Sequence, residues 1–283
     1  MPDTIHAVSF SPAGKTKKVV SHFANLLGEA LALPVKEDSF TLPAERERVR
    51  SYGEDDLVVF GVPTYAGRIP NKALPFVQEL FRAECTKTVA IVTFGNRSFD
   101  NALAELVYEL KNNGFHVIGA AAVVCAHSFA QIGTGRPDAN DRKLLAELAK
   151  SVADTLKDDT LKKGHTAEAP SLHVPGGEPP WEYYQPHGID GEKTVFLKAK
   201  PVVDPALCDR CGICAAACPM GSIPSDAPDT TTGICIKCQA CVKLCPHAAR
   251  SFDDAAYLSH KAMLEQTFSR PAVTQIFSLQ TSA

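Results

Sequence analysis

Two cysteine runs decide the fold of the C-terminal part of the chain. The first reads Cys208-Asp-Arg-Cys211-Gly-Ile-Cys214-Ala-Ala-Ala-Cys218-Pro219, and the second reads Cys235-Ile-Lys-Cys238-Gln-Ala-Cys241-Val-Lys-Leu-Cys245-Pro246. Both match the spacing C-x2-C-x2-C-x3-C-P at every position. Iron is held by soft thiolates, and a short loop with three cysteines wraps one face of an iron–sulfur cubane. The repeat therefore predicts two 4Fe–4S clusters.

The fourth ligand of each cluster must come from outside its own triplet. In two-cluster ferredoxins the last cysteine of each run ligates the other cluster. We therefore assign Cys208, Cys211, Cys214 and Cys245 to cluster I, and Cys235, Cys238, Cys241 and Cys218 to cluster II. Zinc ribbons are the alternative, but they usually use two C-x2-C pairs about a dozen or more residues apart. Residues 199–252 resemble the bacterial 2×4Fe–4S ferredoxins, and this resemblance implies a small α+β module with pseudo-two-fold symmetry.

Composition narrows the class of protein. The chain has 283 residues, of which 45% are hydrophobic, and a formal net charge of −3. This charge leaves no basic excess to neutralise the phosphates of a nucleic acid. The N-terminus does not read as a secretory signal, and no apolar stretch approaches the roughly 18 to 20 residues that span a bilayer. We expect a cytoplasmic protein with reduced cysteines and without a nucleic-acid partner or a membrane span.

The N-terminal two-thirds alternates strand-like and helical patterns. An apolar run at 4–10 is followed by the loop Ser11–Thr16 and a helical pattern, and further strand-like runs lie at 57–62, 89–94 and 116–125. Helical stretches lie near 71–82, 99–113 and 139–157. This alternation predicts a doubly wound parallel sheet. We expect this α/β domain over 1–160, a Pro/Gly/aromatic linker over 161–198, the cluster module over 199–252, and a C-terminal helix and tail over 253–283.

Three loops that follow strands in this pattern are candidates for a ligand site, because open α/β sheets bind ligands at the carboxyl ends of their strands. A tight Ser/Gly/Thr loop between a strand and a helix presents backbone N–H groups to a phosphate. An aromatic residue in each of the other two loops would sandwich a flat ring system. The candidates are Ser11, Ala13, Gly14, Lys15 and Thr16 in the first loop, Pro63, Thr64, Tyr65, Ala66 and Gly67 in the second, and Gly95, Asn96, Arg97, Phe99 and Asp100 in the third.

These loops resemble those of flavodoxins, and the whole chain to about residue 252 is similar to fusion proteins that join a flavodoxin domain to a two-cluster ferredoxin. The resemblance implies FMN, with its phosphate on Ser11–Thr16 and its isoalloxazine ring between Tyr65 and Phe99. The chain departs from the family pattern in having Ala13 where Thr or Ser is common, Lys15 in a loop that is usually neutral, and Phe99 where a Tyr is usual.

Three functions follow from these features. The first is an electron-transfer protein that relays electrons between FMN and the clusters, couples one- and two-electron transfers, and serves a redox partner protein. The second is a flavin-dependent reductase of a small-molecule acceptor, fed by the clusters. The third is a P-loop ATPase, since Gly14-Lys15-Thr16 resembles the end of a Walker A loop, although position 9 is Ser where that motif requires Gly. No acid/base constellation is recognised. His127 and Arg136 follow the last strand and could border the flavin, but we interpret them as ordinary loop residues. Cys85 and Cys125 are assigned no role.

Overall fold

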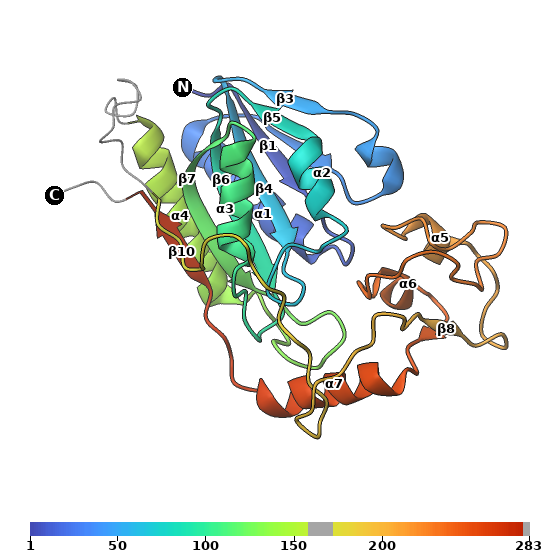
Figure 1. The fold of residues 1–283 in the computed structure, drawn as a ribbon. Coiled ribbons are helices and arrows are strands. Elements are labelled where there is room, and N and C mark those ends of the chain that lie inside the picture. The colour runs from blue at the N-terminus through green and yellow to red at the C-terminus, as the bar shows by residue number, and fades with distance from the viewer. Residues whose placement is uncertain (158–171, 280–283) are drawn as a thin grey trace.

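The computed structural model of the protein describes residues 1–157 and 172–279. Residues 158–171, which hold the end of the expected α/β domain and the start of the expected linker, lie outside the described part, as do residues 280–283. Figure 1 shows a sheet domain, a smaller module beside it, and a C-terminal segment that runs from the module back to the sheet.

A parallel sheet organises the N-terminal domain. Its parallel strands are β1 (Thr4–Ser9), β2 (Val35–Ser39), β4 (Asp56–Pro63), β6 (Lys87–Phe94) and β7 (His116–Val124). They lie in the order β7-β6-β4-β1-β2, which is the flavodoxin-like order of a doubly wound fold. The predicted α/β class and the strands expected at 57–62, 89–94 and 116–125 are confirmed.

Helices cover both faces of the sheet. Helices α1 (Lys15–Leu31) and α4 (Ala139–Lys157) bury residues such as Phe23 and Leu148 in one core, while α2 (Leu74–Glu79) and α3 (Ala102–Asn112) cover the other face with residues such as Leu106. A short 3-10 helix, η1 (Pro43–Arg46), and a two-stranded parallel ribbon of β3 (Arg50–Tyr52) and β5 (Phe81–Ala83) complete this domain. This layering leaves the loops at the carboxyl ends of β1, β4, β6 and β7 free to form a site.

The cysteine module is a structural duplication. Helices α5 (Ile213–Ala216) and α6 (Ala240–Lys243) occupy equivalent places in the two cysteine runs. Residues at equivalent positions also share left-handed backbone: φ is 60° at Arg210 and 55° at Lys237, and 77° at Gly212 and 68° at Gln239. The antiparallel strands β8 (Val202–Val203) and β9 (Arg250–Ser251) join the start of the module to its end. The predicted pseudo-two-fold α+β module is therefore present in the backbone.

The C-terminal segment returns to the N-terminal sheet. Helix α7 (Ala255–Thr267) follows the module, and strand β10 (Gln275–Ser278) then pairs antiparallel with β7 as a sixth strand (Figure 1). Thr274 fixes this return, because its hydroxyl donates to the Asp141 carboxylate at 2.6 Å and accepts from the Val124 N–H at 3.0 Å. The sequence pattern predicted the helix and gave no indication of the strand.

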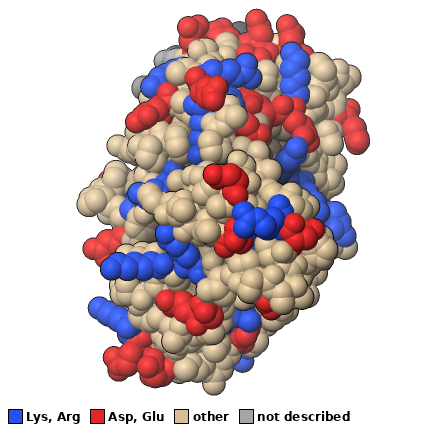
Figure 2. Space-filling view, turned by 90° about the vertical axis from the view of Figure 1, so that its right-hand side faces the viewer, with Lys and Arg blue, Asp and Glu red and all other residues tan. Residues whose placement is uncertain are grey.

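Acidic and basic side chains are interspersed over the face shown in Figure 2, without a large field of one sign. Over residues 1–157 and 172–279, no helix combines the length and apolar character needed to cross a membrane.

Candidate cofactor sites

A small cavity in the module is bordered by four cysteines. They are Cys208, Cys211 and Cys214 from the first run and Cys245 from the second, the same set that the spacing assigns to cluster I. The Ala249 N–H donates to the Cys245 Sγ at 3.3 Å. Backbone N–H groups directed at sulfur stabilise thiolate ligands and tune the potential of a cluster. These residues fit one 4Fe–4S cluster with three ligands from the first run and one from the second.

The second set of thiols is more deeply buried. Backbone N–H groups donate to two of its sulfurs, from Ser222 to Cys218 and from Lys237 to Cys235, at 3.3 and 3.4 Å. Burial, reinforced by the neighbouring thiols, raises the pKa of Cys238 to about 12. A thiolate at this place therefore needs compensating positive charge, which coordinated iron supplies.

Within the described residues, no group of three or more His, Cys, Asp or Glu side chains is close enough to hold a single metal ion. Ligands around a cubane stand farther apart than ligands around one ion, since they bind different iron atoms.

A cavity of about 710 Å³ opens at the carboxyl ends of the parallel strands. Its charged lining residues are all basic: Lys15, Lys72, Arg97 and Lys237. Its size lies within the range of small-molecule and cofactor pockets. The predicted flavin-site residues that line it are Ser11, Ala13, Lys15, Thr16, Pro63, Thr64, Tyr65, Ala66, Gly95 and Arg97.

The polar groups of this cavity fit a bound phosphorylated ligand. The Thr64 hydroxyl is enclosed and has no hydrogen-bond partner within the described residues, so it leaves a bond that a ligand can make. Gly14 precedes α1 with φ of 76° and provides no side-chain cap, while the Ser11 hydroxyl accepts from the Lys17 N–H at 2.9 Å. The N–H groups of Lys15 and Thr16, which come before Lys17 at this helix start, are available to an anion.

Lys15 lies in the phosphate loop, but its ammonium is shared with another loop. It donates to the carbonyl oxygens of Ala126 and His127, the latter at 3.2 Å. Burial, followed by the neighbouring Lys243 ammonium, lowers the pKa of Lys15 to about 8. Two adjacent cations at the mouth of a phosphate loop would be stabilised by an anion.

Five predicted residues do not line the cavity, and Phe99 requires a correction. Its ring is buried in the core, with its centroid 5.4 Å from that of Phe94, so it cannot present an open face to a flavin. The ring belongs to the same apolar cluster as Leu103 and Leu106 of α3.

The polar members of this group are engaged elsewhere. The Asn96 side chain donates to the carbonyls of Phe268 and Arg270 and accepts from the Ala272 N–H. Asp100 forms an ion pair with Arg97. Gly14 and Gly67 supply left-handed backbone, with φ of 76° and 79°.

The linker closes one side of the cavity. The Tyr184 N–H donates to the Ala66 carbonyl at 2.8 Å, and the Tyr184 ring lies 3.9 Å from the Arg97 guanidinium. The Tyr183 hydroxyl donates to the Ile69 carbonyl, and Trp181 packs edge-on against Tyr108. The three linker aromatics thus contact the sheet domain, and Tyr184 also faces His260 of α7.

The cavity reaches the second set of cysteines. Residues 234–237, which include Cys235, form part of its wall. Burial raises the pKa of Tyr65 well above its usual value, and the neighbouring Cys238 and Cys235 add to this effect. Tyr65 of the predicted flavin loop therefore lies near two cysteines that are assigned to cluster II.

Three of the further lining residues were not recognised in the sequence, and a fourth, His127, was interpreted as a loop residue. His127, Phe129, Phe196 and His260 come from the β7–α4 loop, the linker and α7. No local motif marks them, because they meet only when the C-terminal segment packs against the sheet domain.

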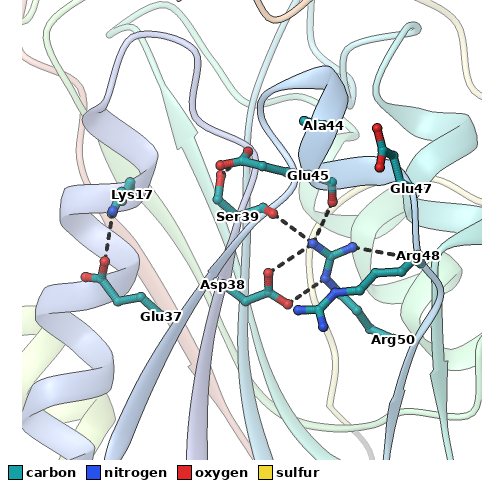
Figure 3. Close-up of a pocket in the computed structure, with 9 residues that line it drawn as sticks. All are labelled: Lys17, Glu37, Asp38, Ser39, Ala44, Glu45, Glu47, Arg48 and Arg50. Carbon is teal, nitrogen blue, oxygen red and sulfur yellow. Dashed lines mark hydrogen bonds and ion pairs between the residues drawn. The ribbon is translucent and has the colours of Figure 1, made fainter.

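A second open cavity of about 700 Å³ lies over β2 and η1 (Figure 3). The Arg50 guanidinium at its base donates to the Asp38 carboxylate and to the carbonyls of Ser39 and Glu45. Lys17 pairs with Glu37 at its edge. These ionic groups are satisfied within the wall, so the cavity offers no comparable site.

Comparison with known proteins agrees with the geometry of the module. Two models described as 4Fe-4S binding domain match residues 200–223 and 232–256. No curated protein matches this chain.

The solved structures similar to this chain include flavodoxins and a larger enzyme. An archaeal flavodoxin is 15% identical, with a TM-score of 0.41 over 55% of this chain and 99% of its own. A Streptococcus pneumoniae flavodoxin is 17% identical, with a TM-score of 0.40 over 54% and 99%. Rubredoxin oxygen:oxidoreductase from Desulfovibrio gigas is 18% identical, with a TM-score of 0.41 over 55% of this chain and 37% of its own.

The strand order itself places the N-terminal domain among flavodoxin-like folds. Residues 200–223 and 232–256 are two 4Fe–4S binding domains, carried on the same chain as this flavodoxin-like parallel sheet.

Proposed function

We propose that the protein is a cytoplasmic electron-transfer iron–sulfur flavoprotein that relays electrons between FMN in the large cavity and two 4Fe–4S clusters. The observation that supports it most is the shared wall of this cavity. Phosphate-loop residues such as Thr16 and the cluster II cysteine Cys235 line the same space. A ligand in this cavity would therefore lie beside a cluster, as a relay requires.

In this proposal some residues bind FMN and others ligate the clusters that carry the electrons. The loop Ser11–Thr16, with Lys15, holds the phosphate, while Thr64 and Tyr65 contact the ring system. The eight cysteines of the two runs ligate the clusters in the crosswise sets. FMN exchanges one or two electrons and each cluster exchanges one, so the chain would couple pair transfers to single transfers.

Cluster II is the centre next to the flavin in this proposal, and cluster I is the exit to a partner protein. Cys211 of cluster I is exposed. The neighbouring apolar side chains of Leu207 and Ile213 are also exposed, by 49% and 42%. Apolar side chains around an exposed redox centre suit a small, transient protein interface.

A small-molecule reductase is the second candidate. The cavity extends past the flavin loops to residues 194–197 of the linker and to His260 and Leu264 of α7. This extension gives room for an acceptor beside the flavin.

Cofactor content gives the first test. Anaerobically purified protein should hold about eight irons and one FMN per chain. Four or fewer irons would contradict two clusters, and a colourless, flavin-free protein that cannot be loaded with FMN would contradict the flavin site.

Electron flow gives the second test. Reduced protein is mixed with cytochrome c, which is too large to enter the cavity, and oxidation of the flavin is followed by stopped-flow absorbance. In Cys241→Ser, which targets cluster II, oxidation by cytochrome c should slow at least tenfold, while oxidation by benzoquinone stays near the wild-type rate. Iron content and circular dichroism verify that the variant is folded. Equal rates with cytochrome c in both proteins would refute the relay.

A further inference from the structure

His127 enters the cavity wall in one fixed orientation. It follows β7, and its Nδ1 accepts hydrogen bonds from the N–H groups of Ala130 and Phe129 at 3.0 and 3.3 Å. A nitrogen that accepts these bonds carries no proton, so the proton of the neutral ring is on Nε2. Burial, with the nearby Lys15 ammonium next in size, lowers the pKa of His127 to about 3. His127 is therefore a neutral hydrogen-bond donor at physiological pH.

The Nε2 edge of His127 lies beside the predicted flavin loop. A Cβ placed on Gly95 would stand 2.2 Å from the His127 Cδ2 atom, which is bonded to Nε2. Gly95 is thus needed at this position because the imidazole occupies the space of a side chain.

His260 of α7 also lines this cavity, and its ring nitrogens have the opposite hydrogen-bonding roles to those of His127. Its Nδ1 lies 2.8 Å from the His187 carbonyl, and a carbonyl oxygen only accepts. Nδ1 therefore carries the proton, and Nε2 of the neutral ring is an acceptor. The ring stacks on Phe196 at 5.3 Å between centroids and is only 5% exposed. Burial lowers the pKa of His260, which favours this neutral form.

Both imidazoles lie near the ring of Phe129. The Phe129 ring centroid is 4.4 Å from that of His127 and 6.3 Å from that of His260. Neither Nε2 has a hydrogen-bond partner in the part of the chain that the structure describes, and neither is among its fully enclosed unpaired polar atoms. Both histidines line the large cavity, so this is the open space available to the two Nε2 atoms.

We propose that His127 and His260 form a recognition pair, in which the Nε2–H of His127 donates to, and the Nε2 of His260 accepts from, the edge of one small planar ligand. The inference rests on the proposed function, since it concerns the same cavity. The ligand has a carbonyl-type acceptor beside an N–H or O–H donor on its rim. The isoalloxazine ring has such an edge, and so does a second planar acceptor of the aminoquinone class, whose amino group stands beside a ring carbonyl, bound against it.

Asparagine substitutions separate this role from packing. In His127→Asn the side-chain oxygen still accepts at the Nδ1 position, which keeps the ties to Phe129 and Ala130, but the Nε2 donor is lost. In His260→Asn the amide still donates to the His187 carbonyl, but the Nε2 acceptor is lost. His22→Asn on α1, which does not line the cavity, is the matched control.

FMN affinity of the full chain with intact clusters is measured by quenching of flavin fluorescence. 2-Amino-1,4-naphthoquinone, which carries a carbonyl beside an N–H donor, is then titrated against the reduced, FMN-loaded protein, and its half-saturating concentration is taken from the rate of flavin reoxidation. Each cavity variant should weaken binding of one and the same ligand about 3- to 10-fold, as expected for one hydrogen bond, while the control stays at the wild-type value.

The outcomes identify the ligand or overturn the pair. Weaker FMN binding in both variants assigns the pair to the flavin edge. Unchanged FMN binding with a raised half-saturating aminonaphthoquinone concentration in both assigns it to a second ligand. If wild-type protein binds FMN and the variants match it in both measurements, or only one variant differs, the pair is refuted while the proposed function stands. A wild-type chain that binds no FMN refutes both.

Discussion

Lys15 shows how a single residue can belong to two loops at once. Its position in the phosphate loop was predicted, whereas its hydrogen bonds to the Ala126 and His127 carbonyls depend on the folded β7–α4 loop. Its pKa, lowered to about 8 by burial and then by Lys243, means that its charge in the ligand-free protein is lost above that pH.

This lowered pKa predicts a pH dependence of FMN binding. Phosphate is already a dianion above about pH 7 and prefers the protonated ammonium, so affinity should be highest below pH 8 and fall above it, by at most about tenfold per pH unit. Fluorescence titrations at pH 7 to 9.5 measure the effect, with riboflavin, which lacks the phosphate, as the control ligand. An equal pH dependence for FMN and riboflavin, or one unchanged in Lys15→Met, would contradict the role of Lys15.

Arg68 is a second residue with more than a local role. It pairs with the fully buried Glu105 carboxylate, donates to the Trp181 carbonyl at 2.7 Å and lies 4.4 Å from the Tyr183 ring centroid. Glu105 also accepts from the Ile69 N–H. The ion pair thus connects the loop after β4, helix α3 and the linker.

Removing Arg68 should destabilise the fold strongly, because it leaves the buried Glu105 carboxylate without its cationic partner. Arg68→Met should lower the free energy of unfolding by about 3 kcal/mol, measured by denaturant titration. Lys17→Met, which removes the half-exposed partner of Glu37, should cost less than about 1 kcal/mol. Part of the loss should return in the double variant Arg68→Met/Glu105→Gln. Similar losses in Arg68→Met and Lys17→Met would argue against a buried ion pair.

At the scale of elements, strand β10 and the segment before it tie the cluster module to the sheet. Asn96 holds this segment with three side-chain hydrogen bonds, to Phe268, Arg270 and Ala272. Its φ of 67° also suits the left-handed backbone of its loop. The residue predicted to contact FMN thus anchors the C-terminal segment instead.

Asn96→Gly tests this anchor, because glycine accepts the same backbone but has no side chain. Loss of three hydrogen bonds from a buried side chain should speed amide exchange over 268–279 and destabilise the segment by about 2 kcal/mol. Hydrogen–deuterium exchange with mass spectrometry measures it. Asn112→Gly at the exposed end of α3 should leave exchange in 268–279 unchanged, and an unchanged rate in Asn96→Gly would refute the anchor.

At the scale of the whole molecule, the two parts are stabilised by different means. The sheet domain has an apolar core on each face. The module has four-residue helices and two-residue strands, which bury little apolar surface of their own. Its order should therefore depend on its clusters, because metal-binding free energy is folding free energy in such small domains.

Removal of iron by a chelator under reducing conditions should destabilise the cluster module but not the sheet domain. Amide protection should fall over residues 202–251 and remain over β1, β4 and β6, as measured by hydrogen exchange. Riboflavin-binding affinity of the iron-free chain should also fall, since residues 234–237 form part of the cavity wall. Unchanged protection across the module would show that its core suffices without iron.

The cluster module, the parallel α/β class and the phosphate loop can be predicted from the sequence alone, because each depends on local spacing or periodicity. It did not reveal β2, whose five residues are mostly polar, or β10, whose four residues are too short for a pattern. It also misplaced Phe99, since burial in the core is decided by neighbours distant in the chain. One cavity is bordered by Cys235, Lys15, His127 and His260. This arrangement could not be predicted from local patterns, because it requires the C-terminal strand to return to the first domain.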